Sequence, residues 1–243
     1  MDITSSSAAG IKKKIKQWAN KLRKMKNEKK LEHLDGVIFY GDPGCGKTIA
    51  VNNLAKVAGV PLFMITLGEL VNENGTVATN GQVIFDIVQS YANSNNTPVI
   101  VFFDEFDMIL PFRKGNSQLS QEDKILLQQF LTQLTESKGV MVVANTNYFY
   151  RIDDAITRHG RLGYHVYFHL PTKNDIISII KNINGSKKLF LSETNMSTVA
   201  ENFVGKNVAY IVNFFIDYVD YADNKRVSSD DALLDLYIDE FGV

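Results

Sequence analysis

The sequence predicts a doubly wound α/β domain built on a parallel sheet, followed by a small C-terminal helical domain. Predicted strands alternate with predicted helices between residues 37 and 169, and only helical patterns follow Pro171. The strand pattern at Val99–Phe103 is a continuous apolar run, as expected for a strand that helices cover on both faces. The 243 residues, 45% hydrophobic and 22% charged, have the composition of a globular protein. This composition excludes collagen-like, disordered and disulfide-scaffold proteins.

The first predicted element is a basic amphipathic helix. Residues 1–30 contain 10 lysines and arginines but only 2 acidic residues, whereas the rest of the chain is acidic. Three interpretations fit such a helix: it lies on an anionic membrane surface, it binds nucleic acid, or it packs its apolar stripe against the core domain or a neighbouring molecule. The apolar positions follow the period of a helix, and they are Ile11, Ile15, Trp18, Leu22 and Met25.

The core domain is predicted to open with a β-turn-α-β unit. A strand at Val37–Tyr40 precedes a glycine-rich turn, a helix at Ile49–Ala58 and a second strand at Pro61–Thr66. Glycines and asparagines between residues 68 and 81 predict a loop. A helix is expected to follow at Gln82–Tyr91, because its apolar residues recur at helical spacing.

The other core strands are expected at Val99–Phe103, Val140–Ala144 and Val166–His169, with a helix at Lys124–Leu134. We therefore divide the chain into an N-terminal helix (1–30), a core domain (31–171) and a helical domain (172–243). The helices expected in the helical domain are Lys173–Asn182, Ser197–Asn202, Asn207–Tyr221 and Ser229–Phe241.

The segment Gly41–Thr48, which reads GDPGCGKT, fits the phosphate-loop pattern GxxxxGK[ST]. It lies between a predicted strand and a predicted helix, which is the context that this motif requires. Glycines allow backbone N–H groups to surround a polyphosphate at a helix N-terminus, while Lys47 reaches the β- and γ-phosphates and the Thr48 hydroxyl binds Mg²⁺. The candidate nucleotide-binding residues are Gly41, Asp42, Pro43, Gly44, Cys45, Gly46, Lys47, Thr48 and Ile49.

Two acids follow the apolar strand Val99–Phe103. In this topology the carboxyl end of such a strand lies beside the phosphate loop, so Asp104 is expected to hold Mg²⁺ through its water shell. Glu105 is expected to orient or deprotonate the attacking water. The run Asn145-Thr146-Asn147 follows the next strand, Val140–Ala144, and an amide there can position that water against the γ-phosphate. The predicted metal-binding residues are Thr48 and Asp104.

Three runs, GDPGCGKT, VIVFFDEFD and VMVVANTNYFYRIDDAITRHGRL, together resemble the AAA+ ATPases, and most closely the AAA group with katanin, the proteasomal ATPases and FtsH. The resemblance covers about residues 34–240. It implies ATP as the nucleotide, a C-terminal helical lid and assembly into a ring, commonly a hexamer. It also implies that Asn147 is the sensor-1 asparagine and that Arg158 and Arg161 act as arginine fingers on the ATP of a neighbouring subunit. Arginine suits this role because its planar, permanently charged group pairs with phosphate oxygens.

The sequence departs from the family pattern in three places. Asp42 stands where the phosphate loop usually has proline, which puts an acid near the phosphates. Residues 67–81 contain no aromatic residue, although AAA unfoldases carry an aromatic pore-loop residue there. The run Gly205-Lys206-Asn207 replaces the usual Gly-Ala-Asp, and Lys206 is either a cation that reaches the nucleotide or a solvated lysine.

The motifs and the resemblance predict a Mg²⁺-dependent ATPase that remodels a protein substrate or complex. Two alternatives are an ATPase that acts on nucleic acid through residues 11–30 and a nucleotide-gated assembly module with slow turnover. A cytoplasmic location is expected, because the single cysteine, Cys45, cannot form an intrachain disulfide and no apolar run is long enough to span a membrane. The predicted catalytic residues are Lys47, Glu105, Asn147, Arg158 and Arg161.

Overall fold

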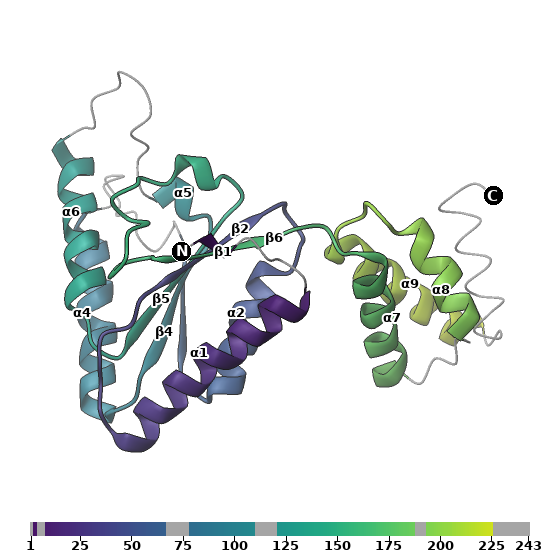
Figure 1. The fold of residues 1–243 in the computed structure, drawn as a ribbon, viewed down its shortest axis with the longest axis horizontal. Coiled ribbons are helices and arrows are strands. Elements are labelled where there is room, and N and C mark those ends of the chain that lie inside the picture. The colour runs from purple at the N-terminus through teal and green to yellow at the C-terminus, as the bar shows by residue number, and fades with distance from the viewer. Residues whose placement is uncertain (1, 4–7, 67–77, 110–120, 188–192, 226–243) are drawn as a thin grey trace. The chain divides into compact units, whose positions relative to one another are not determined.

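The computed structural model describes residues 2–3, 8–66, 78–109, 121–187 and 193–225, and the chain divides into two compact units (Figure 1). Unit 1 comprises residues 1–41 and 47–168, and unit 2 comprises residues 42–46 and 169–243. Among the described residues, no helix combines the length and the apolar character needed to cross a membrane.

Unit 1 is built around a sheet whose strands follow the order β1-β6-β2-β5-β4-β3, and every adjacent pair is parallel. Every residue of the central strands β4 and β5 is buried, as their apolar sequences predict. The parallel pairing and the intervening helices confirm the predicted doubly wound α/β fold. The strands are β1 (Asp2–Ile3), β2 (Val37–Gly41), β3 (Leu62–Ile65), β4 (Val99–Phe103), β5 (Val140–Thr146) and β6 (Tyr164–Phe168).

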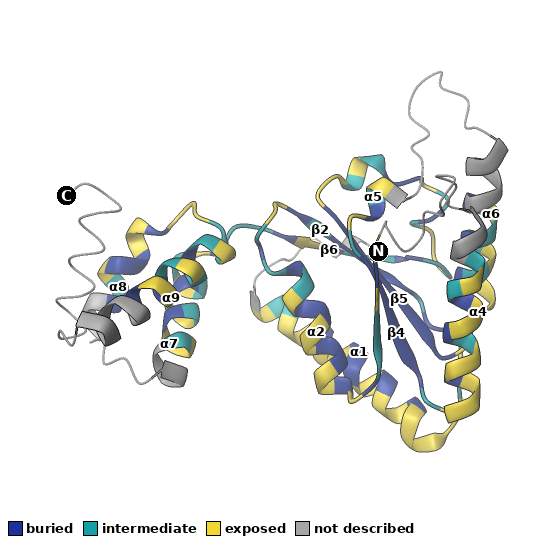
Figure 2. Cartoon of the chain, turned by 180° about the vertical axis from the view of Figure 1, so that it is seen from behind, coloured by how far each residue is buried: buried dark blue, intermediate teal, exposed yellow. Residues whose placement is uncertain are grey.

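Helices cover both faces of this sheet: α1 and α2 lie on one face, and α4 and α6 on the other (Figures 1 and 2). Under α4 and α6, the rings of Phe103, Phe106 and Phe130 pack with centroids 5.3–6.0 Å apart. Such clusters bury large apolar areas and stabilise the sheet that positions the site. The helical segments of unit 1 are α1 (Ala8–Glu28), α2 (Lys47–Ala58), α4 (Ala78–Asn95), α5 (Phe106–Ile109), α6 (Gln121–Glu136) and the 3₁₀ helix η1 (Phe149–Arg151).

The basic helix α1 packs its apolar stripe inside unit 1. The Trp18 ring lies 6.2 Å from the ring of Phe39 on β2 and 5.9 Å from that of Tyr164 on β6. Leu22 is fully buried, and Lys26 donates a hydrogen bond from Nζ to the Gly59 carbonyl oxygen just after α2 (2.5 Å). Of the three interpretations of this helix, packing against the core therefore accounts for its apolar stripe.

Unit 2 contains a small helical core. Phe203, Phe215 and Tyr218 are almost completely buried, and they pack with Ile176 and Ile211. The helices with this core are α7 (Lys173–Lys187), α8 (Glu193–Asn202) and α9 (Val208–Lys225).

Several element boundaries differ from those predicted. β5 continues through Thr146, because Asn145 and Thr146 pair as strand residues despite their polar side chains. α4 begins at Ala78, so residues 78–81 are helical rather than loop. β1 was not predicted because two residues carry no readable period, and it forms only by pairing with β6. The predicted loop at residues 68–77 and the predicted helix at residues 229–241 lie outside the described residues.

Candidate nucleotide-binding site

Lys47 and Asn147 are brought together at the carboxyl end of the sheet. Lys47 opens α2 and is 5% exposed, and its Nζ donates to the Gly41 carbonyl oxygen and to Oδ1 of Asn147, both at 2.8 Å. These acceptors compensate the cost of burying an ammonium group. The predicted binding residues are exposed (Asp42, Pro43, Ile49), partly buried (Gly44, Gly46, Thr48) or buried (Gly41, Cys45, Lys47).

The predicted acid pair lies at the end of β4, in the strained backbone that often marks a functional site. Asp104 is partly buried, and its Oδ1 accepts hydrogen bonds from Nδ2 of Asn145 (2.5 Å) and from the backbone N–H of Glu105 (2.9 Å). Glu105 is exposed and has a φ of 49°, which a residue with a β-carbon rarely adopts. Such a conformation costs about 1–3 kcal/mol and persists where the surroundings enforce it.

Asn145 is a site residue that the sequence analysis did not select. It is 8% exposed on β5, and it orients Asp104 by the hydrogen bond from its Nδ2. Its Oδ1 is buried and has no hydrogen-bond partner among the described residues. The signal in the sequence was an amide within a strand that is otherwise apolar, since a buried polar side chain needs a partner.

The residues present fit a magnesium ion. The Thr48 hydroxyl, in the first turn of α2, and the Asp104 carboxylate are hard oxygen donors, which Mg²⁺ prefers. Both residues are partly buried, so each keeps some access to solvent. Because Asn145 and the Glu105 N–H both bond to one oxygen of Asp104, the carboxylate orientation is set by the protein itself.

Arg158 and Arg161 lie in the loop between η1 and β6. Arg158 is exposed. Arg161 is partly buried, and its Nη1 donates to the Ala155 carbonyl oxygen of the same loop at 2.6 Å. Neither arginine forms a hydrogen bond or ion pair with Asp104 in the described part of unit 1. The structure therefore does not join the predicted arginine fingers to the other predicted catalytic residues.

Within unit 2, the phosphate loop contacts the start of α9. Asn207 donates from Nδ2 to the Pro43 carbonyl oxygen (3.3 Å), and the Ala209 N–H donates to the Gly44 carbonyl oxygen (3.0 Å). Gly44 has a φ of 75°, and a β-carbon there would lie 2.7 Å from Nδ2 of Asn207. Glycine is thus favoured at this position by its conformation, and a β-carbon would also require the Asn207 side chain to move.

Lys206, the residue before Asn207, lies over an aromatic ring. Nζ of Lys206 lies 4.7 Å from the centroid of the Tyr210 ring, where a cation and an aromatic face attract each other. Lys206 is exposed, and within unit 2 Asn207 rather than Lys206 is the residue of this run that bonds to the phosphate loop.

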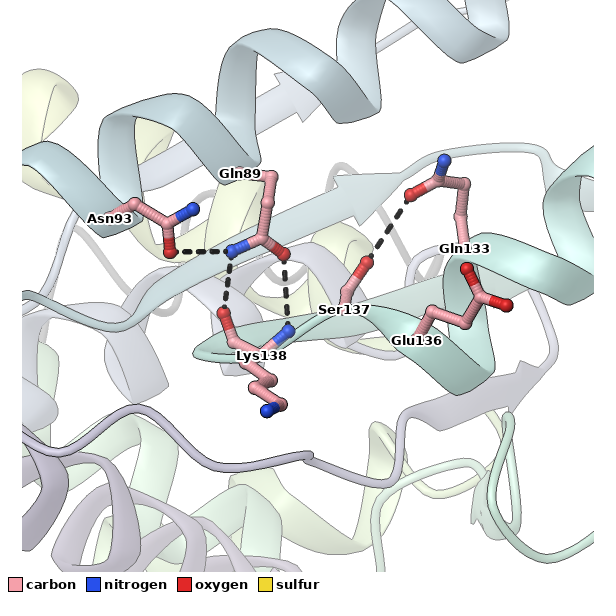
Figure 3. Close-up of a pocket in the computed structure, with 6 residues that line it drawn as sticks. All are labelled: Gln89, Asn93, Gln133, Glu136, Ser137 and Lys138. Atoms are coloured by element: carbon pink, nitrogen blue, oxygen red, sulfur yellow. Dashed lines mark hydrogen bonds between the residues drawn. The ribbon is translucent and has the colours of Figure 1, made fainter.

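A polar pocket of about 320 Å³ lies at the C-terminal ends of α4 and α6 (Figure 3). The Gln89 side chain forms two hydrogen bonds with the Lys138 backbone there: Nε2 donates to the carbonyl oxygen (2.9 Å), and Oε1 accepts from the N–H (3.1 Å). This pairing mimics a step of a β-ladder and holds α4 to the segment before β5. None of the predicted site residues lines the pocket, whose lining consists of Gln89, Asn93, Gln133, Glu136, Ser137 and Lys138.

The parallel sheet, the glycine-rich segment before α2 and the acid pair after β4 define a P-loop nucleoside triphosphatase core. The family model described as "ATPase family associated with various cellular activities (AAA)" matches residues 37–170, which is more than half of the chain. The chain therefore belongs to the AAA family of ATPases. This result confirms the predicted family and the predicted enzyme class.

Curated relatives share moderate identity with the chain. Peroxisomal ATPase PEX1 of Saccharomyces cerevisiae is 31% identical over 201 residues, which are 78% of this chain and 19% of that protein. Ribosome biogenesis ATPase RIX7 of the same yeast is 27% identical over 223 residues, 84% of this chain and 26% of that protein. ATP-dependent zinc metalloprotease FtsH 2 of Phytoplasma mali is 28% identical over 219 residues, which are 86% of this chain and 31% of that protein. The chain thus spans less than a third of each of these relatives.

Proposed function

We propose that this chain is a Mg²⁺-dependent ATPase domain that hydrolyses ATP between subunits of a hexameric ring and remodels a protein substrate or complex. The observation that carries the proposal is that the predicted catalytic groups of unit 1 form two sets with no hydrogen bond or ion pair between them among the described residues. Lys47 bonds to Asn147, whereas Arg158 is exposed in a different loop. An arginine that completes the site of a neighbouring subunit has to be presented in this way. A metalloprotease among the relatives supports a protein substrate.

In the proposed mechanism, water attacks the γ-phosphate of ATP and ADP leaves. Glu105 polarises the water, and Asn147 helps to position it. Lys47 and the arginines of the next subunit stabilise the charge that develops on the phosphate oxygens. Mg²⁺, held by Thr48 and by Asp104, supplies further neutralisation of that charge when it is bound.

The absence of a cysteine other than Cys45 supports the predicted cytoplasmic location.

ATP turnover per subunit, measured over a wide range of protein concentration, tests the assembly. Because each site needs a neighbour, specific activity is expected to rise with concentration and to level off once rings have formed. Sedimentation at the same concentrations measures the oligomer directly. Turnover that is constant down to concentrations where only monomer sediments would contradict the proposal. Negligible turnover at every concentration despite ATP binding would instead favour the nucleotide-gated assembly module.

A second candidate function, an ATPase that acts on nucleic acid, is favoured by the outer surface of α1. The apolar stripe of this helix is buried, so its basic side chains are presented to solvent on a fixed helix rather than on a free arm. Such a surface binds phosphates by releasing their counterions. The exposed basic residues of α1 are Lys12, Lys13, Lys16, Lys21, Arg23, Lys24 and Lys26.

We expect a triple variant, Lys12→Gln with Lys16→Gln and Arg23→Gln, to test this candidate without unfolding unit 1. If α1 contacts phosphates, the variant should bind duplex DNA more weakly, and the slope of log affinity against log salt should decrease by up to about 3. Lys181→Gln, on an exposed lysine of α7 in unit 2, is the control for loss of a positive charge outside α1. Deletion of residues 1–30 is unsuitable because it would expose the core under Trp18. Equal binding and equal slopes for the wild type and the triple variant would reject the candidate.

A further inference from the structure

The loop that carries Arg158 and Arg161 is held by a side chain from a distant part of unit 1. Oδ1 of Asp35, two residues before β2, accepts a hydrogen bond from the Gly160 N–H at 3.1 Å across 125 residues of sequence. The adjacent Gly36 N–H donates to the Arg161 carbonyl oxygen at 2.6 Å. The backbone between the two arginines is therefore attached to the start of β2 at two successive points.

The loop contains a glycine in a left-handed conformation, and it also buries Ile156 and Leu162 in the core of unit 1. Gly160 has a φ of 80°, in the region that only glycine adopts without strain. Inside the loop, the Arg161 N–H donates to the Arg158 carbonyl oxygen (3.2 Å), and the Leu162 N–H donates to that of Ile156 (3.0 Å). These bonds close the turn on itself but do not tie it to the sheet. Asp35 supplies a charged acceptor from outside the turn, and hydrogen bonds to a charged group are roughly twice as strong as neutral ones.

Asp35 is itself anchored rather than free in solvent. Its side chain is 26% exposed, and its Oδ1 lies 3.7 Å from Nε2 of His33. The other ring nitrogen of His33, Nδ1, lies 3.4 Å from the Ser137 carbonyl oxygen, and His33 forms an isolated antiparallel bridge with Lys138. The segment that presents Asp35 is thereby fastened to the connection between α6 and β5. These contacts of His33 and Asp35 hold the arginine loop in place within its own subunit.

We propose that Asp35 is a positioning residue that sets where Arg158 and Arg161 stand for the ATP of the neighbouring subunit. The inference rests on the proposed function, in which these arginines act across a subunit boundary. Arginines that act in this way gain no support from the site of their own subunit, so their placement depends on the scaffold that carries them. Misplacement of a catalytic group by about 1 Å can cost a hundredfold in rate.

Substitution of Asp35 is expected to lower ATP turnover while leaving the affinity for nucleotide unchanged. Asp35→Ala should lower kcat by about tenfold to a hundredfold, with the affinity of the same subunit for a fluorescent ATP analogue within about twofold of wild type. Asp35→Asn keeps an oxygen acceptor for the Gly160 N–H and should restore most of kcat. Asp154→Ala, which removes an exposed carboxylate from the same loop, is the matched control. If Asp35→Ala does not fold, Asp35→Glu serves as the test, because its carboxylate is displaced by one methylene.

Subunit mixing decides whether Asp35 acts on a neighbour. Lys47→Ala subunits lack a working ATP site but keep intact arginines, so mixing them with Asp35→Ala subunits should restore turnover at the shared boundary. Mixing Asp35→Ala with Arg158→Ala subunits should restore none, because both carry the same defect. Normal kcat in Asp35→Ala overturns the inference. The inference is also overturned if the mixture of Asp35→Ala with Lys47→Ala stays inactive while the mixture of Arg158→Ala with Lys47→Ala regains turnover. If both mixtures stay inactive, the proposed action of the arginines between subunits is overturned as well.

Discussion

Replacement of Lys47 with alanine is expected to lower ATP turnover by at least about a hundredfold and to abolish tight ATP binding. Lys47 is a buried cation at the start of α2, and its Nζ already donates two hydrogen bonds of 2.8 Å. Its removal takes away the positive charge that would face the β- and γ-phosphates. Binding of a fluorescent ATP analogue and release of phosphate measure the two effects separately.

Glu105→Gln complements this test because it should leave binding intact. A glutamine is nearly isosteric but cannot polarise water as a carboxylate does, so turnover should fall by about 10²- to 10⁴-fold while nucleotide affinity is preserved. Lys56→Ala, which removes an exposed lysine from α2, is the control for Lys47→Ala on the same helix. Unchanged turnover in both Lys47→Ala and Glu105→Gln would show that the chemistry occurs elsewhere in the molecule.

The double variant Arg158→Ala, Arg161→Ala is expected to retain ATP binding and to lose about 10³- to 10⁵-fold in turnover. The reason is that neither arginine forms a hydrogen bond or ion pair with Asp104 in the described part of unit 1. Their charge would therefore act on a neighbouring subunit, where it stabilises the transition state rather than the bound ground state. Phosphate release and ATP-analogue affinity are measured on the same preparations.

The mixing behaviour of the same double variant distinguishes action between subunits from action within one. Added to wild type at increasing ratios, it should reduce activity more steeply than simple dilution, because each variant subunit also impairs its neighbour. Lys56→Ala, at an exposed lysine of α2, should leave activity unchanged at every ratio. A linear decrease with the fraction of double variant would indicate that the arginines serve their own subunit.

Much of the fold could be predicted because its signals are local. The apolar run of β4 reports burial on both faces, and the structure has this strand with the predicted boundaries. The phosphate loop could be recognised because its residues are contiguous and its flanking elements, β2 and α2, have clear periods. The family was predicted from the resemblance of three motif runs to the AAA+ ATPases, and the match over residues 37–170 confirms it.

The remaining contacts of the site depend on residues that are far apart in sequence. Asn145 bonds to Asp104 across 41 residues, and Asp35 bonds to Gly160 across 125. No periodicity or motif connects such pairs, because the hydrogen bonds exist only after the strands have aligned. The amide in β5 was visible in the sequence, but its partner was not.

The sequence by itself thus determined the layers of the fold and the phosphate loop, since each follows from local spacing and side-chain chemistry, whereas the family was predicted from a resemblance to known ATPases. Only the tertiary structure decided that α1 packs its stripe on the core, through Trp18 against Phe39 and Tyr164. A basic amphipathic helix has the same pattern whether it covers a membrane, a nucleic acid or its own domain. Which apolar surface it buries is settled by the complementary surface that the folded sheet and α2 provide.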